Sequence, residues 1–145
     1  MIYTEKTKKA LNICYEAHKD AFDKSGVPYV FHPFHLAEQM QDEKTTIVAL
    51  LHDVVEDTDY TFEMLRAAGF GDDVLEALAL LTRSEEIRTE EDYLRYIAKV
   101  KENPIARTVK IADLMHNSDL SRFSVIQERD IMRAAKYQKA LLLLQ

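Results

Sequence analysis

Apolar residues recur at intervals of three and four along most of the chain, which is the spacing of one face of an α-helix. The first such segment runs from Glu5 to about Asp23, and residues 25–28 (SGVP) then interrupt it. No segment alternates apolar and polar residues in the manner of a half-buried β-strand. The hydrophobic pattern therefore predicts an all-α protein.

Seven further helices are expected, several of them preceded by threonine, aspartate or asparagine, the residue types that cap helix N-termini. They cover residues 33–41, 45–55, 61–69, 72–82, 89–100, 103–115 and 128–144. Ile47 to Leu51 is apolar on almost every side, so the helix over residues 45–55 should be the central, buried one. We predict a helical bundle of about seven to eight helices, formed as a single domain by residues 1–145.

The composition agrees with this prediction, since the chain has only three glycines and three prolines. A turn-rich β-sandwich or β-barrel would need more of both. The net charge is −6 without a basic block, whereas a nucleic-acid-binding protein usually carries a positive surface. We expect no nucleic-acid partner. An anionic small molecule stays compatible with this charge, because a bound divalent metal can reverse the local field.

The single cysteine, Cys14, cannot form a disulfide within the chain and fits a reducing compartment. It lies in a helical apolar pattern, which is typical of a buried structural thiol. The N-terminal residues lack the apolar region of a signal peptide, and the longest apolar runs, 47–51 and 140–144, are too short to cross a membrane. We expect a soluble cytoplasmic protein without a membrane partner. The pattern indicates no particular oligomeric state.

The central apolar helix ends in four polar residues, His52, Asp53, Glu56 and Asp57. His52 and Glu56 are four positions apart, as are Asp53 and Asp57, so each pair would share one face of the helix. Three carboxylates in one small volume repel one another and cost free energy to bury unless a cation lies among them. The group is therefore either a solvated helix end with a buried histidine or part of a divalent-metal site.

Two residues elsewhere favour the metal site. His32 stands at the start of the second helix, and Asp113 interrupts the apolar run over residues 109–115. A lone carboxylate in such a run is unusual unless it has a partner. Together with His52 and Asp53 they would offer two imidazoles and two carboxylates, a set that suits Mn, Fe, Zn or Co. A six-coordinate metal would keep positions for substrate and for a water whose pKa it could lower.

Three segments also carry a resemblance to a known family: residues 26–33 (GVPYVFHP), 50–58 (LLHDVVEDT) and 109–117 (VKIADLMHN). The order His…His-Asp…Asp resembles the signature of the HD-domain phosphohydrolase superfamily. The surrounding residues are similar to one branch, the hydrolase domain of RelA/SpoT proteins and the stand-alone small alarmone hydrolases, including the metazoan SpoT homologues. The resemblance covers nearly the whole chain. The chain ends where a synthetase domain begins in the long members, so we expect no synthetase activity.

This resemblance implies an all-α HD-type fold, a single Mn²⁺ ion and removal of the 3′-pyrophosphate from (p)ppGpp, the alarmones of the stringent response. It implies four metal ligands: His32, His52, Asp53 and Asp113. Glu56 and Asp57 match the family's Glu-Asp pair, which positions or deprotonates the attacking water. A carboxylate one turn beyond the ligands can also reach such a water without binding the metal.

Four residues are expected to bind the substrate: Lys24, Tyr29, Lys110 and Asn117. Asn117 lies one turn after Asp113 and matches a family asparagine that contacts the nucleotide. Lys110 lies one turn before Asp113, where it could reach a phosphate or pair with a carboxylate. Tyr29 could stack on a base or pack beneath its loop.

One position departs from the family pattern. The family usually has Arg-Lys before Gly-x-Pro-Tyr, whereas this chain has Asp23-Lys24 in a loop about two residues shorter. An acid beside a polyphosphate would weaken its binding, so the departure bears on the substrate more than on the metal or the hydrolysis. Arg122 or Lys19 could compensate for it.

Three functions are compatible with these residues. The first is Mn-dependent hydrolysis of (p)ppGpp, in which water attacks the proximal phosphorus of the 3′-diphosphate and pyrophosphate is released. The second is an HD phosphatase or phosphodiesterase that acts on another phosphorylated nucleotide, which Asp23 favours. The third is a metal-binding regulatory module without turnover, against which the Glu56-Asp57 pair argues. We expect the first, with a small-molecule nucleotide as the partner.

Overall fold

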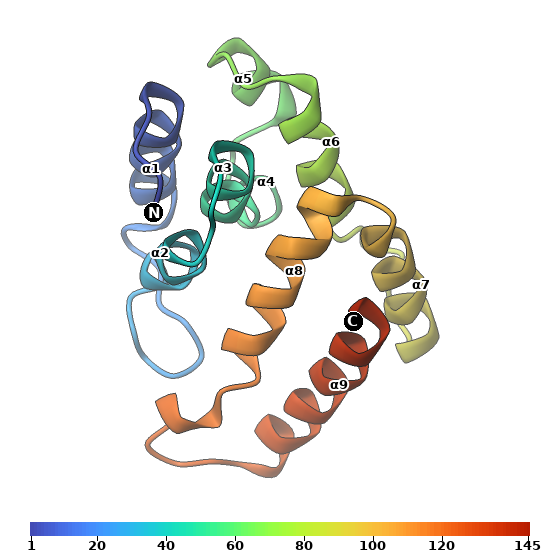
Figure 1. Ribbon diagram of the computed structural model, residues 1–145. Coiled ribbons are helices and arrows are strands. Elements are labelled where there is room, and N and C mark those ends of the chain that lie inside the picture. The colour runs from blue at the N-terminus through green and yellow to red at the C-terminus, as the bar shows by residue number, and fades with distance from the viewer.

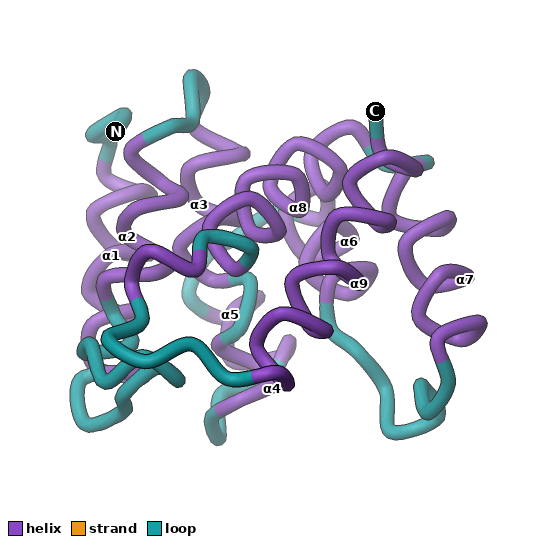
Figure 2. The backbone as a smooth tube through the Cα atoms, turned by 90° about the horizontal axis from the view of Figure 1, so that it is seen from below, coloured by secondary structure: helices purple, strands orange, loops and turns teal.

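Nine α-helices and one 3₁₀ turn make up the computed structural model, which describes residues 1–145 (Figure 1). The elements are α1 Glu5–His18, α2 Phe31–Glu38, α3 Glu43–Leu51, α4 Val54–Asp57, α5 Phe62–Ala67, α6 Asp72–Leu81, α7 Glu90–Lys101, α8 Pro104–Asn117, η1 Leu120–Arg122 and α9 Glu128–Leu144. Figure 2 shows helices and loops without strands, and the only extended pairing is an isolated bridge between Phe22 and Pro28. The prediction of an all-α fold is confirmed.

Helix α3 lies at the centre of the core. Residues 45–51 of this helix are all buried, and it packs against α1, α2, α6 and α8. Asp42 caps its N-terminus by accepting a hydrogen bond from the Thr45 backbone N–H at 2.8 Å. The prediction that this apolar segment forms the central, buried helix is therefore confirmed.

Helix α8 lies between two groups of helices (Figure 1). It packs against α2 and α3 on one side and against α6, α7 and α9 on the other. Its start follows the expected signals, since Asn103 accepts a hydrogen bond from the Ala106 N–H and Pro104 occupies the first turn. Side chains of α8 can consequently meet residues of both groups.

The first helix ends at His18, earlier than its apolar pattern predicts. Asp23 explains the difference, because its backbone N–H donates to the Val27 carbonyl at 2.8 Å. Its carboxylate accepts hydrogen bonds from the backbone N–H groups of Ser25 and Val27, at 2.8 and 3.0 Å. Such local bonds satisfy the backbone outside a helix. Residues 19–30 therefore form a closed loop.

The helix expected over residues 45–55 is broken, and this corrects the sequence-based geometry. Helix α3 ends at Leu51 and α4 begins at Val54, while Asp53 has φ −110° and ψ 0°, outside the helical region. His52 and Glu56 therefore do not share one continuous helical face. The bend instead gathers the carboxylates of Asp53, Glu56 and Asp57, which have oxygens within 4.8 Å of one another.

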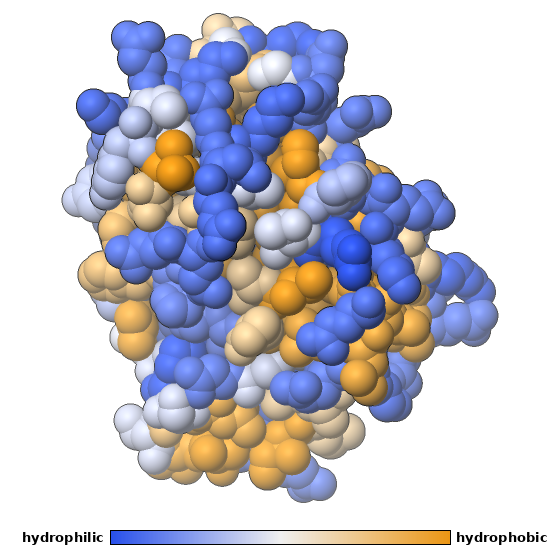
Figure 3. All heavy atoms as spheres, in the orientation of Figure 1, coloured by the Kyte–Doolittle hydropathy of each residue, from blue (hydrophilic) through white to orange (hydrophobic).

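The connection from α8 to α9 carries apolar side chains outward. They gather at the lower end of the molecule in Figure 3, and Val125 and Ile126 are 72% and 50% exposed. An ion pair between Arg122 and Asp23 ties this connection to the loop after α1. None of the helices combines the length and the hydropathy that a membrane-spanning segment requires.

Candidate metal centre

The four predicted ligands come together from three parts of the bundle. Helix α2 carries His32, the bend after α3 carries His52 and Asp53, and α8 carries Asp113. His32, His52 and Asp113 are buried, with exposed fractions of 4%, 4% and 5%. His32 Nε2 lies 2.8 Å from Asp113 Oδ1, and His52 Nε2 lies 3.0 Å from Asp53 Oδ2 and 3.5 Å from Asp113 Oδ1.

These separations fit a common divalent cation. Ligand atoms bonded at about 2.1 Å and at right angles to one another lie about 3 Å apart. The ligand atoms of His32, His52 and Asp53 are also mutually within 4.8 Å. The His/Asp group can therefore hold a divalent metal.

The hydrogen bonding of His52 gives independent support for a cation. Its Nδ1 lies 2.7 Å from the Ala49 carbonyl oxygen, which can only accept, so Nδ1 carries the hydrogen. The neutral ring then presents a lone pair at Nε2. That atom is buried and has no hydrogen-bond partner, although carboxylate oxygens lie beside it. Acceptors facing one another in this way need a positive charge between them.

The charges of the group point the same way. Burial lowers the pKa of His52, but the carboxylates of Asp53 and Asp113 raise it well above its ordinary value. Burial disfavours ionised Asp113, yet the ammonium group of Lys110 and the neighbouring imidazoles of His32 and His52 hold its pKa well below the usual range. The carboxylates stay ionised, and the space beside His52 favours one positive charge, either a proton or a metal cation.

Two side chains support the ligands from outside. The Tyr29 hydroxyl donates a hydrogen bond to Asp53 Oδ2, and its ring packs 4.9 Å from His18 and 5.6 Å from His32, measured between ring centroids. His32 Nδ1 lies 2.7 Å from His116 Nδ1, so one of these nitrogens donates to the other. Such contacts fix ring orientation and ligand basicity in metal sites.

Two of the predicted substrate-binding residues contact Asp113. Lys110 Nζ lies 2.8 Å from Asp113 Oδ2 with its side chain 11% exposed, so its ammonium group pairs with this carboxylate. The Asn117 amide donates to Asp113 Oδ1 at 3.0 Å. Of the two alternatives for Lys110, the structure shows the ion pair. Its contact with a substrate stays a prediction, as does that of Asn117.

The Glu-Asp pair lies at the edge of the ligand group. One Glu56 oxygen accepts a hydrogen bond from the Arg83 backbone N–H at 2.7 Å, and the other lies 3.4 Å from Arg83 Nη2. Asp57 has no such partner. Partial burial and the carboxylates of Asp53 and Glu56 raise the pKa of Asp57 to about 6. Glu56 is thus held in place, while Asp57 is a base that ionises near neutral pH.

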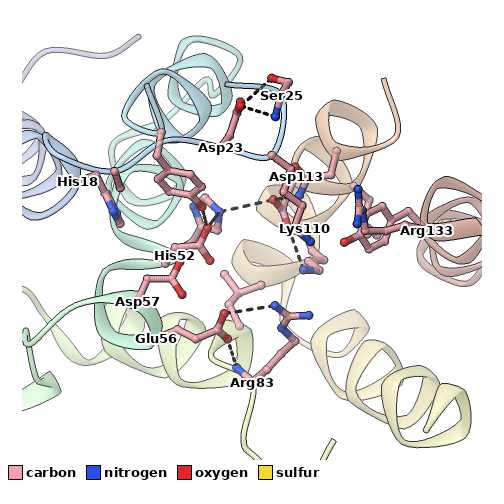
Figure 4. A pocket seen from close by; sticks show the side chains of 18 of the residues that line it. His18, Asp23, Ser25, His52, Glu56, Asp57, Arg83, Lys110, Asp113 and Arg133 are labelled. Carbon is pink, nitrogen blue, oxygen red and sulfur yellow. Dashed lines mark hydrogen bonds and ion pairs between the residues drawn. The ribbon is translucent and has the colours of Figure 1, made fainter. Parts of the chain in front are cut away.

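A cavity of about 430 Å³ opens over these residues. In Figure 4, His52, Glu56 and Asp57 lie on one side of it, with Lys110 and Arg133 on the other. Lys24 also lines the cavity. A volume of this size is within the range of small-molecule sites.

The Asp23 carboxylate lines the cavity, but its charge is paired. Its Oδ2 pairs with Arg122 Nη1 at 2.9 Å, and Oδ1 accepts the bonds that close the loop. The expectation that this acid would oppose a polyphosphate is therefore weakened, because Arg122 neutralises it. Binding of phosphate by Arg122 or Lys19 in place of the family arginine is not tested by this pairing and stays a prediction.

Several lining residues were not among the predicted site residues: His18, Arg83, Tyr93, Arg133 and Tyr137. His18 is 2% exposed, and its Nε2 has no hydrogen-bond partner. Arg83, Tyr93, Arg133 and Tyr137 come from the second half of the chain, where no motif marks them. Arg133 lies on the amphipathic helix α9. A basic residue on the inner face of this helix was the only feature of the sequence that could have indicated its place in the cavity.

A model of the HD domain family matches residues 10–122, more than half of the chain. The chain belongs to this family. This HD domain is 32% identical over 123 residues to the guanosine-3′,5′-bis(diphosphate) 3′-pyrophosphohydrolase of Aquifex aeolicus, and 36% identical over 122 residues to that of Spiroplasma citri. These matches cover 79% and 76% of this chain but only 18% and 16% of the relatives, so the chain spans less than a fifth of their length.

A solved structure is also similar over almost its whole length. It belongs to a metazoan orthologue of SpoT that hydrolyses ppGpp and plays a role in starvation responses. The two structures superpose with a TM-score of 0.77 at 27% sequence identity, covering 99% of this chain and 94% of the other. The resemblance to RelA/SpoT hydrolases is thereby confirmed.

Proposed function

We propose that this HD domain, formed by residues 1–145, hydrolyses the 3′-diphosphate of (p)ppGpp in a metal-dependent reaction. The convergence of His32, His52, Asp53 and Asp113, with the unpartnered Nε2 of His52 among the carboxylates, carries the proposal. Relatives that bear the name of this activity support the choice of substrate.

These four residues would hold the ion, and two imidazoles with two carboxylates suit Mn²⁺, with Fe, Zn or Co as alternatives. When bound, a divalent cation polarises phosphoryl oxygens and lowers the pKa of water. Tyr29 and His116 keep Asp53 and His32 oriented toward it.

Asp57 accepts the proton of the attacking water. Its pKa of about 6 leaves most of it ionised at neutral pH while keeping it basic enough to take a proton. Glu56, fixed by Arg83, orients the same water through its carboxylate. Arg83 acts here as a positioning residue.

The water oxygen bonds to the proximal phosphorus of the 3′-diphosphate, and the bond from that phosphorus to the ribose 3′-oxygen breaks. The ribose oxygen takes up a proton, so ppGpp and water yield GDP and pyrophosphate. Lys24 and Asn117 contact the substrate from the wall of the cavity, and Tyr29 bounds it. Lys110 neutralises Asp113 and so reduces the negative charge of the site that would repel the phosphates.

Incubation of the protein and Mn²⁺ with ppGpp, pppGpp and a panel of other nucleotides tests this function through product identification. We expect GDP and pyrophosphate from ppGpp. Asp53→Asn should abolish turnover, whereas Asp59→Asn, a matched change at an exposed position, should not. Release of orthophosphate, or turnover confined to other nucleotides, would contradict the proposal and favour a phosphatase or phosphodiesterase.

A further inference from the structure

A second groove adjoins the metal-centre cavity. It has a volume of about 820 Å³, and Glu56, Arg83, Tyr93 and Arg133 line both spaces. The two spaces are therefore neighbours, with the Glu56–Arg83 ion pair at their junction. A ligand bound beside the catalytic carboxylates would pass this ion pair to extend into the groove.

Positive charge is concentrated at this junction, although the protein as a whole carries −6. Arg83 and Arg133 each pair with a carboxylate, whereas Lys24 and Lys136 form no ion pair. Lys136 instead lies 4.1 Å above the Tyr93 ring. Burial and the neighbouring charges of Arg83 and Lys110 lower the pKa of Lys136, although Glu90 opposes the shift. The groove is lined by more basic than acidic side chains: Arg83, Arg88, Arg133, Lys136 and Lys139 against Glu56, Glu85 and Glu90. Such a cluster attracts an anion.

The Tyr93 hydroxyl, at the same junction, is a buried donor without an acceptor. Tyr93 is 1% exposed, and its hydroxyl has no hydrogen-bond partner, although the residue lines both spaces. Burial raises the pKa of Tyr93 to about 12, so the hydroxyl keeps its proton and can donate. A buried polar group normally has a partner, and a phosphate oxygen that reached this hydroxyl would supply one.

We propose that this groove binds the second anionic group of the substrate, the 5′-phosphates of a nucleotide whose 3′-diphosphate lies at the metal centre. The assignment rests on the proposed function. Lys136 and Tyr93 contact the phosphates directly, and Lys24 approaches from the loop after α1. Guanidinium and ammonium donors suit phosphate, since each oxygen can accept several charge-assisted hydrogen bonds.

Kinetics with two substrates distinguish an effect at this subsite from one at the metal centre. They are ppGpp and guanosine 3′-diphosphate, which lacks the 5′-phosphates. Lys136→Gln should raise the KM for ppGpp about tenfold, as expected for loss of one charge-assisted hydrogen bond, with kcat little changed. Tyr93→Phe should raise it by a smaller factor. Neither should affect the substrate without 5′-phosphates. Lys101→Gln and Tyr15→Phe make the same chemical changes at exposed positions and should behave as wild type.

Calorimetric titration with GDP in the presence of a chelator tests the groove without turnover. GDP carries the 5′-diphosphate alone, so its binding should weaken about tenfold in Lys136→Gln. If GDP does not bind, or binds wild type and Lys136→Gln equally, the subsite is overturned even where ppGpp is hydrolysed. If no alarmone is hydrolysed but GDP binding still depends on Lys136, the proposed reaction fails while the anion site stands.

Discussion

The two ring nitrogens of His52 have different neighbours in the candidate metal centre. Its Nδ1 donates to the Ala49 carbonyl at the end of α3, so Nε2, which faces Asp53 and Asp113, is the nitrogen that can bind a cation. The ring orientation thus follows from the backbone of the helix that carries it. The neighbouring ligand Asp53 is fixed by a separate contact, the hydroxyl of Tyr29.

Tyr29→Phe removes that hydroxyl and leaves the ring in place. Outer contacts of this kind are worth about 10- to 100-fold in metal affinity or activity. We expect the Mn²⁺ concentration for half-maximal ppGpp hydrolysis to rise by at least about tenfold, with most of the rate regained at saturating metal. Tyr3→Phe, at an exposed position, is the control. An unchanged metal dependence in Tyr29→Phe would show that the hydroxyl does not support Asp53.

The residues that come together at the candidate metal centre could be picked out from the sequence because their motifs are local. His52-Asp53 breaks an apolar run, and Asp113 interrupts another. The partners of Asp23 could not be found in this way, since Arg122 lies 99 positions further along the chain. An ion pair between two loops leaves no periodic signal in the sequence.

At the scale of elements, the loop after α1 and the connection from α8 to α9 are joined by Asp23 and Arg122. Both side chains are largely buried, with exposed fractions of 13% and 20%. Arg122 also donates to the His116 carbonyl at the end of α8, at 3.2 Å. The ion pair therefore fixes the loop that presents Lys24 to the cavity.

A double-mutant cycle measures this link. Asp23→Asn keeps an oxygen for the Ser25 and Val27 N–H groups but loses the charge, and Arg122→Gln removes the partner. We expect each to lower the free energy of unfolding in urea, with a coupling energy of about 1 kcal/mol. Asp23→Arg, which restores the family residue, should reduce ppGpp hydrolysis, because it places a cation against Arg122. Strictly additive single effects would show that the pair is not coupled.

Three helix starts were predictable, because Thr61, Thr89 and Asn103 are N-caps whose side chains accept backbone hydrogen bonds. The break after α3 was not, since residues 47–55 are helix-compatible and contain neither glycine nor proline. Tertiary contacts decide it: Asp53 is bonded by Tyr29, and Glu56 is bonded by the Arg83 backbone. Packing against distant segments overrides a local pattern of this kind.

At the scale of the whole molecule, one ion would join α2, the α3–α4 bend and α8. Ligand binding to the native state alone stabilises a protein by mass action. Cys14 on α1 reports on this stability, because it is the only cysteine, is 0% exposed and has a pKa that burial and Asp53 raise to about 12. Its thiol reacts only when the core opens.

Alkylation of Cys14 should therefore be slow at pH 8 and slower still with Mn²⁺. At a metal concentration 100 times the Kd, the rate through global opening should fall about 100-fold. Asp53→Asn should show no such protection. Equal labelling rates with and without metal in the wild-type protein would mean that the ion does not bind the folded bundle.

We propose that four side chains from three parts of the bundle hold one divalent ion that hydrolysis of ppGpp requires. Titration of metal-free protein with Mn²⁺, while GDP and pyrophosphate are followed, tests it most directly. We expect no turnover without metal, and a rate of hydrolysis that rises with Mn²⁺ and saturates at one ion per chain. Full turnover in the presence of a chelator, or saturation at a different stoichiometry, would contradict it.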